Sequence, residues 1–208
     1  LKLQATRLSD QPQDALKTAR LLAKHQGFSE GAALGLLRAL AFEALDGARD
    51  ADQVRRVWHQ LEPADRHDPL VAARAATRMA AQGASDEARA WLRPLIDDLD
   101  EFTPDERAAL ALALLAAQDG IGSEWLPRLE AAVAAYPREP ALALAAGSVL
   151  AERQLWGKAR QLLRQAAADP TLGRAGRRRA WLRLAQIAEQ EGDTAAAAGA
   201  YESAARAA

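Results

Sequence analysis

The side chains best suited to binding chemistry in this sequence are cationic, and they lie in two short segments. Segment 156–160 holds a tryptophan and two cations, and segment 174–183 holds five arginines within ten residues. A guanidinium binds carboxylate or phosphate oxygens in a bidentate geometry, so both segments suit contact with an anion. The candidate partner-binding residues are Trp156, Lys158, Arg160, Arg174, Arg177, Arg178, Arg179 and Arg183.

Three anions fit this chemistry: the acidic surface of a partner protein, the headgroups of anionic lipids, and the carboxylate of a small ligand. Gly173 and Gly176 are expected to keep the start of the arginine segment flexible. The alternative is a solvated loop whose arginine stems lie on neighbouring helices, with no ligand at all.

No motif in the sequence predicts an enzyme. It contains no His-Glu-x-x-His and no glycine loop for phosphate. Its single Gly-x-Ser-x-Gly match, from Gly27 to Gly31, falls in the break before an expected helix, whereas a nucleophile elbow follows a strand. Cys is absent and the histidines His25, His59 and His67 are scattered, which argues against a thiolate zinc site and against haem ligation. The acidic residues between 97 and 106 are expected to solvate a loop and a helix start. We therefore expect no catalytic residue, no metal and no cofactor.

The composition favours helices and a chain without a general attraction to nucleic acid. The 208 residues include 27 Lys or Arg and 28 Asp or Glu, which gives a formal charge of −1. No apolar run reaches the ~18 residues of a membrane span. Ala and Leu dominate, Val and Ile are scarce, and apolar residues recur at spacings of three and four. We predict an all-α chain.

Short breakers divide the chain into helix hairpins that form one domain, 1–208. Asp68-Pro69 predicts an N-cap followed by proline at the first helical position, and Thr103 to Glu106 predicts a capping box. The residues 1–25 are expected to be the truncated end of a further hairpin. The complete hairpins are expected at 30–62, 69–98, 105–136, 139–168 and 177–207.

The last hairpin carries the tetratricopeptide (TPR) pattern, with large residues such as Trp181 and Leu184 followed by small ones such as Ala197. The twentieth place of that repeat requires a small residue, because two helices cross closely there. It falls at steps of 34, 37, 34 and 38 residues, close to the repeat length of about 34. The residues at this place are Val54, Ala88, Trp125, Ala159 and Ala197. The sequence therefore predicts a right-handed α-solenoid of TPR-like helix hairpins.

Two features of this predicted solenoid remain open in the sequence. Trp125 is too large for a close helix crossing, so its hairpin is either skewed or aligned differently. The helices within 108–117 and 141–151 are apolar nearly all round, which predicts burial on both sides. Either the superhelix is tight or another element fills its groove.

The run Gln154-Leu155-Trp156-Gly157-Lys158-Ala159, which opens the second helix of a hairpin, resembles the HemY family of bacterial TPR proteins associated with haem biosynthesis. Segments 52–58 and 136–142 are similar to that family as well. The resemblance implies a scaffold that binds porphyrin-pathway enzymes. It also implies a soluble domain, tethered to the bacterial inner membrane by an N-terminal region absent from this chain. The stretch 172–180 departs from the family by being longer than a usual turn.

The resemblance brings no catalytic residues with it, and it leaves two alternatives. One is a generic TPR scaffold in another pathway, and the other is a carrier of porphyrin or haem. The partners expected from the sequence are proteins, together with an anionic membrane surface near the tether. Nucleic acid is not expected.

Overall fold

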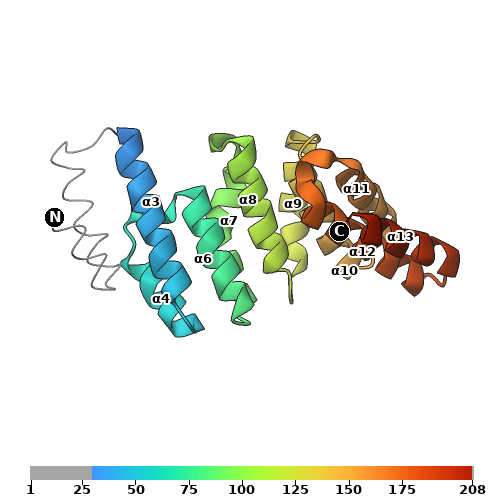
Figure 1. Cartoon of the computed structure of the whole chain (residues 1–208), viewed down its shortest axis with the longest axis horizontal. Helices are drawn as coiled ribbons and strands as arrows, with labels where there is room; N and C mark the ends of the chain where they lie inside the picture. Colours follow the sequence, from blue (N-terminus) through green and yellow to red (C-terminus); the bar gives the residue numbers. More distant parts are fainter. Residues whose placement is uncertain (1–29, 208) are drawn as a thin grey trace.

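The computed structural model describes residues 30–207, and this part of the chain is all-helical (Figure 1). It contains eleven α-helices and three short 3-10 helices, and no strand occurs between residues 30 and 207. The prediction of an all-α chain is confirmed for these residues, whereas the expected hairpin at 1–25 and His25 lie outside them. The α-helices are α3 (Glu30–Gly47), α4 (Ala51–Gln60), α5 (Pro63–Arg66), α6 (Pro69–Ala81), α7 (Ser85–Asp97), α8 (Pro104–Ala116), α9 (Leu126–Ala135), α10 (Pro140–Glu152), α11 (Trp156–Ala168), α12 (Gly173–Gln190) and α13 (Thr194–Arg206). The 3-10 helices are η1 (Leu99–Glu101), η2 (Ser123–Trp125) and η3 (Pro170–Leu172).

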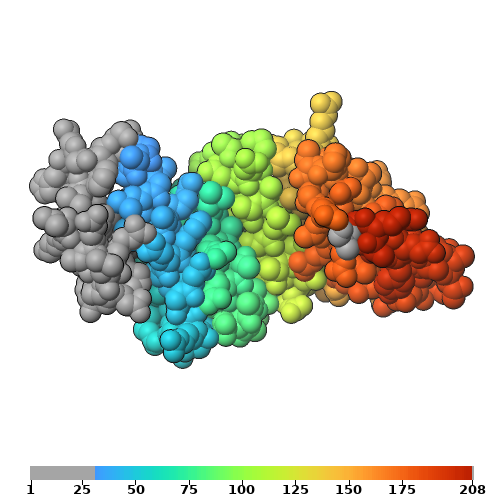
Figure 2. Space-filling view, viewed as in Figure 1, coloured from blue at the N-terminus to red at the C-terminus, as the bar shows by residue number. Residues whose placement is uncertain are grey.

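The helices follow one another as packed neighbours along the long axis of the molecule. Helices α6 and α7, α10 and α11, and α12 and α13 form closely packed pairs. In addition, α3 packs on α6, α6 on α8, α8 on α10, and α10 on α12. One cluster of buried apolar side chains extends from Leu40 in α3 to Ala200 in α13. Figure 2 shows the elongated outline that this succession produces.

The helix starts follow the capping signals of the sequence. The Asp68 carboxylate accepts hydrogen bonds from the backbone N–H groups of Leu70 and Val71 at 3.0 and 3.1 Å, and Pro69 occupies the first turn of α6. Thr103 and Glu106 form the predicted capping box at the start of α8. Each cap satisfies N–H groups that have no partner inside the helix.

Small residues lie where helices cross closely. Ala88, Ala159 and Ala197 are each buried at the fourth position of the second helix of a pair. A Cβ atom added at Gly147 in α10 would lie 2.8 Å from Leu163 Cγ and 3.3 Å from the Ala159 carbonyl oxygen. There is therefore no room between α10 and α11 for a larger side chain at either helix.

The alignment of Trp125 with these small residues is wrong. Trp125 belongs to the 3-10 helix η2, which precedes α9, and the fourth residue of α9 is the buried Leu129. The extra turn shifts the register by four residues, a change that apolar spacing alone does not reveal. With a leucine at the crossing place, α9 packs more on α10 than on α8. The α3–α4 pair, which has Val54 at this place, is likewise less closely packed than the three alanine pairs.

Ala159→Leu is expected to lower the free energy of unfolding by about 1–3 kcal/mol, because the added atoms overpack the crossing with Gly147. Chemical denaturation measures the effect. Ala90→Leu is the matched control, since Ala90 is exposed on α7 and should change stability little. Equal midpoints for Ala159→Leu and the unaltered chain would contradict the close crossing.

The apolar helix α10 is buried on all sides from Ala141 to Leu150. Helix α12 is longer than its neighbours, and it packs on α10 beside η3. Arg179 of α12 also reaches α8, where its Nη2 donates to the Leu115 carbonyl oxygen at 3.4 Å. The first helix of the following pair, together with η3, therefore covers part of α10. No helix between residues 30 and 207 combines the length and apolarity needed to cross a bilayer.

Candidate functional site

The arginine segment is helical and does not form a flexible loop. Helix α12 begins at Gly173, four residues before the expected start of the last hairpin. Gly173 has a φ of 72°, which turns the chain out of η3, and a Cβ on Gly176 would lie 2.5 Å from Leu172 Cγ. These glycines serve a turn and a close contact, so the expectation of a flexible segment is wrong.

Four of the candidate cations bind other parts of the same chain. Lys158 Nζ lies 2.7 Å from Glu130 Oε1, and Arg160 pairs with Glu191. Arg183 pairs with Glu152 and donates through Nη1 to Gln186 Oε1 at 2.9 Å. Arg179 is the fourth, through its bond to the Leu115 carbonyl.

Arg174, Arg177 and Arg178 lie on α12 at spacings of three and four residues, which places them on one face of the helix. Arg174 and Arg178 are exposed on α12. Arg177 is partly buried, and its Nε has no hydrogen-bond partner in the described structure. The structure therefore pairs Lys158, Arg160 and Arg183 with acids of the same chain and leaves exposed arginines on α12.

Opposite charges instead connect each helix pair to the next. The paired residues are separated by 28 to 32 positions, close to the repeat length. Sequence analysis missed these pairs, although Lys or Arg and Asp or Glu about thirty residues apart are visible in the sequence. The pairs are Arg38–Asp68, Asp46–Arg74, Arg55–Glu87, Asp97–Arg128, Arg107–Glu139, Glu130–Lys158, Glu152–Arg183 and Arg160–Glu191.

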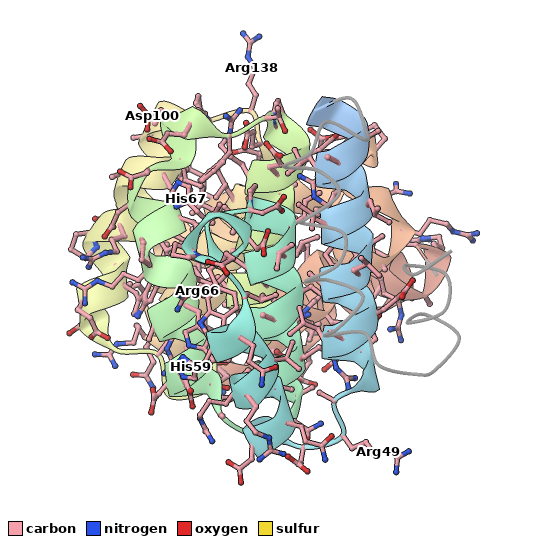
Figure 3. All side chains as sticks on the ribbon, turned by 90° about the vertical axis from the view of Figure 1, so that its left-hand side faces the viewer. Arg49, His59, Arg66, His67, Asp100 and Arg138 are labelled. Carbon is pink, nitrogen blue, oxygen red and sulfur yellow. The ribbon has the colours of Figure 1, made fainter. Side chains whose placement is uncertain are left out.

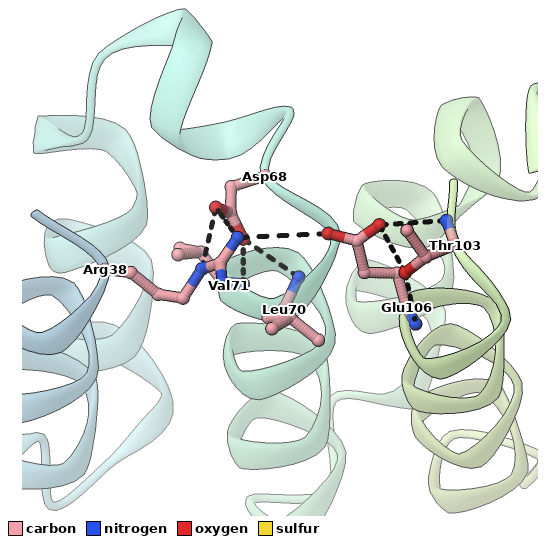
Figure 4. A network of polar contacts seen from close by, with 6 residues as sticks. All are labelled: Arg38, Asp68, Leu70, Val71, Thr103 and Glu106. Carbon is pink, nitrogen blue, oxygen red and sulfur yellow. Dashed lines mark hydrogen bonds and ion pairs between the residues drawn. The ribbon is translucent and has the colours of Figure 1, made fainter. Parts of the chain in front are cut away.

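One polar network joins three consecutive helix pairs (Figure 4). Arg38 of α3 donates to Asp68 Oδ2 through Nε at 2.9 Å and Nη2 at 2.7 Å, while Asp68 caps α6. Arg38 Nη2 also lies 3.9 Å from Glu106 Oε1 in the capping box of α8. Most such pairs are partly exposed and worth about 0–1 kcal/mol each. Together, these ion pairs fix how each helix pair stacks on the next.

Glu106→Gln is expected to lower stability by about 0.3–1 kcal/mol near neutral pH, because it removes an anion from a helix N-terminus. Hydrogen bonds from the backbone and side chain of Thr103, together with Arg38, lower the pKa of Glu106 from its ordinary 4.5. A lowered carboxyl pKa stabilises the fold above the unfolded value and loses that contribution as pH falls below it. Urea unfolding at pH 7 and at about pH 3 should therefore show the difference disappear in acid. A difference that persists in acid would contradict this assignment.

His59 and His67, the two histidines in the described part of the chain, do not form a ligand site. His59 ends α4 and His67 follows α5, and the two lie apart in Figure 3. His67 Nε2 is 3.3 Å from Glu101 Oε2, and its ring centroid is 6.0 Å from that of Phe102. Among residues 30–207, no group of three or more His, Asp or Glu side chains could hold a metal ion.

A groove with a volume of about 820 Å³ brings two of the predicted residues together. It lies where the end of α10, the start of α11 and the second half of α12 meet. Trp156, partly buried at the start of α11, and Arg183 of α12 both line it. The other lining residues are Ala151, Glu152, Gln154, Gln186, Ile187, Glu189 and Gln190. We call this the α10–α12 groove.

A smaller groove of about 330 Å³ separates α9 from α11 on α10. Its walls are mainly apolar, and the Lys158–Glu130 ion pair belongs to its lining. Leu129, the residue at the fourth position of α9, is part of its lining. Lys158 thus lies at a different groove from Trp156, although two residues separate them in the sequence.

No family model matches this chain, and no curated protein and no solved structure is significantly similar to it. Its function must therefore be inferred from its own residues.

Proposed function

We propose that this chain is a non-enzymatic scaffold for protein–protein interaction, built as a right-handed solenoid of TPR-like helix hairpins. The succession of helix pairs supports the solenoid, as do the small residues at the crossings and the ion pairs at repeat spacing. In a repeat architecture each unit contacts only its neighbours, and partners bind on the surface that stacking creates.

The α10–α12 groove is the observation that carries the proposal. It is open, it spans two neighbouring helix pairs, and it combines a partly buried indole with exposed amide and carboxylate groups. Tryptophan is enriched among the residues that dominate binding energy at protein interfaces. A surface of this composition suits a segment of another protein.

The resemblance of residues 154–159 to the HemY family supports a narrower form of the proposal. The partners are then enzymes of porphyrin biosynthesis, and the natural protein is tethered to the bacterial inner membrane. The exposed Arg174 and Arg178 would face anionic lipid beside that tether. A generic TPR scaffold would use the same groove with partners from another pathway.

Site-specific photo-crosslinking in the source cell tests the proposal. A photoreactive residue at Gln190, in the groove, is expected to capture specific proteins, which mass spectrometry identifies. The same residue at Gln60, exposed at the end of α4, is the matched control. Purified partners should then bind the chain and lose affinity for Trp156→Ala.

Two results would decide against these statements. Capture from Gln190 that does not exceed capture from Gln60 would contradict the scaffold function of this groove. Capture of partners unrelated to porphyrin chemistry would agree with the scaffold function but contradict the HemY assignment. Thermal unfolding of Trp156→Ala separates lost binding from lost fold.

A further inference from the structure

The charge that the α10–α12 groove offers to a partner is negative. Its charged lining residues are Glu152, Arg183 and Glu189, which sum to one negative charge. The Arg183 guanidinium is engaged by Glu152 and by Gln186 Oε1. Its positive charge is therefore neutralised inside the groove wall, and Arg183 is a poor site for an incoming anion.

Glu189 is the carboxylate of the groove that pairs with no cation among residues 30–207. It shares a hydrogen bond with the Tyr201 hydroxyl of α13, a contact that raises the pKa of the tyrosine. That bond orients Glu189 without neutralising it, because a phenol carries no charge at neutral pH. A carboxylate has about four acceptor sites, so Glu189 can accept further hydrogen bonds from a cation.

Trp156 is a second group in the groove that attracts cations. The face of an indole ring attracts cations, and arginine is the most frequent protein partner for it. A guanidinium can stack on a ring while donating two hydrogen bonds to a carboxylate, which lysine cannot do. The same groove therefore holds both groups that recognise an arginine side chain.

The amide side chains of the groove suit the backbone of an extended segment. Gln154 and Gln190 are exposed on opposite walls, in the α10–α11 turn and at the end of α12. Each carboxamide offers both a donor and an acceptor, as a peptide group does. A chain without its own secondary structure presents such peptide groups for pairing.

We propose that the α10–α12 groove binds an extended segment of a partner protein that inserts an arginine side chain between Trp156 and Glu189. The proposal rests on the scaffold function proposed above and specifies the chemistry of its partner. Within this groove it also reverses the sign expected from sequence, because Arg183, the one predicted cation that lines it, is paired with the carboxylate of Glu152.

A phage-displayed library of random 12-residue peptides, panned against the whole chain, provides the test. Peptides enriched in arginine are expected. Their affinity, measured by fluorescence anisotropy on synthetic copies, should fall about 10-fold for Glu189→Gln, because a charge-assisted bond is lost. Glu202→Gln is the matched control, since Glu202 is exposed on α13 and does not line the groove. Replacing the peptide arginine with citrulline should weaken binding by a similar factor.

The outcomes distinguish this proposal from the scaffold function. Enriched acidic peptides, or arginine peptides that bind Glu189→Gln and the unaltered chain equally, would overturn the arginine site and leave the scaffold standing. Failure to enrich any peptide, combined with no specific capture in the crosslinking experiment, would overturn both. Circular dichroism of Glu189→Gln, an exposed and conservative change, verifies that the variant is folded.

Discussion

Glu139→Ala is expected to lower the free energy of unfolding by about 3 kcal/mol, the low end of the range for breaking a buried ion pair, because it leaves the partly buried Arg107 guanidinium without its carboxylate. The side chains of Arg107 and Glu139 are only 11% and 17% exposed. Arg107 Nε donates to Glu139 Oε1 at 2.8 Å, and the guanidinium carbon lies 4.0 Å from the centre of the Tyr136 ring. An arginine keeps its proton in proteins, so Arg107 cannot escape the loss of Glu139 by becoming neutral. Urea denaturation followed by circular dichroism measures the change.

The double variant Arg107→Met, Glu139→Leu is the control for this mechanism. It removes both charges and keeps the volume, so it should recover most of the stability that Glu139→Ala loses. The structure favours this outcome, since Glu139 Oε2 is buried without a hydrogen-bond partner and the pair already carries a desolvation cost. A double variant as unstable as the single one would show that packing, and not the stranded charge, dominates.

The helices were predictable because their signals are local. Asp68 before Pro69 and the capping box from Thr103 to Glu106 act within one turn, and both form as predicted. The alanines at the close crossings were also predictable, since any larger residue would force the two helices apart. The apolar sequence of α10 likewise predicted its burial on all sides.

The candidate site was less predictable because charges act through distant partners. Lys158 and Arg160 read as a cationic patch in the sequence, and each is paired with an acid about thirty residues away. No local sequence pattern predicts which carboxylate a long Lys or Arg side chain contacts. The net charge of −1 was the only indication in the sequence that these cations could be neutralised within the chain, because acids and cations are nearly equal in number. The groove arises from three separate helices, so it too has no local signal.

The predicted alignment of equivalent positions in successive helix pairs was wrong where the chain adds a turn. η2 inserts residues before α9, and the tryptophan at its end occupies a repeat place that belongs to Leu129. η3 and Gly173 similarly precede an α12 that starts early. A glycine in a sequence can indicate flexibility, but it can equally indicate a residue with positive φ or a backbone that lies close to a neighbouring side chain. Only the neighbouring atoms distinguish these roles.

The stacked indoles of Trp58 and Trp91 should make Trp58→Ala about as damaging as the loss of Glu139. Their ring centroids are 4.7 Å apart, with planes inclined by 17°, and they join α4 to α7 across two helix pairs. Trp58 is 6% exposed, so its removal leaves a large cavity. The expected cost is about 3–5 kcal/mol, the usual range for a buried aromatic replaced by alanine.

Two measurements distinguish the contribution of indole stacking from that of burying the Trp58 side chain. Stacked indoles couple their electronic transitions, so circular dichroism of the folded chain should lose the exciton couplet in both Trp58→Ala and Trp58→Phe. Chemical denaturation should rank the variants, because phenylalanine refills most of the space and should cost about 1–2 kcal/mol less than alanine. Equal destabilisation by both substitutions would mean that the indole contact itself holds α4 against α7. An unchanged couplet in Trp58→Ala would contradict the stacking of Trp58 on Trp91.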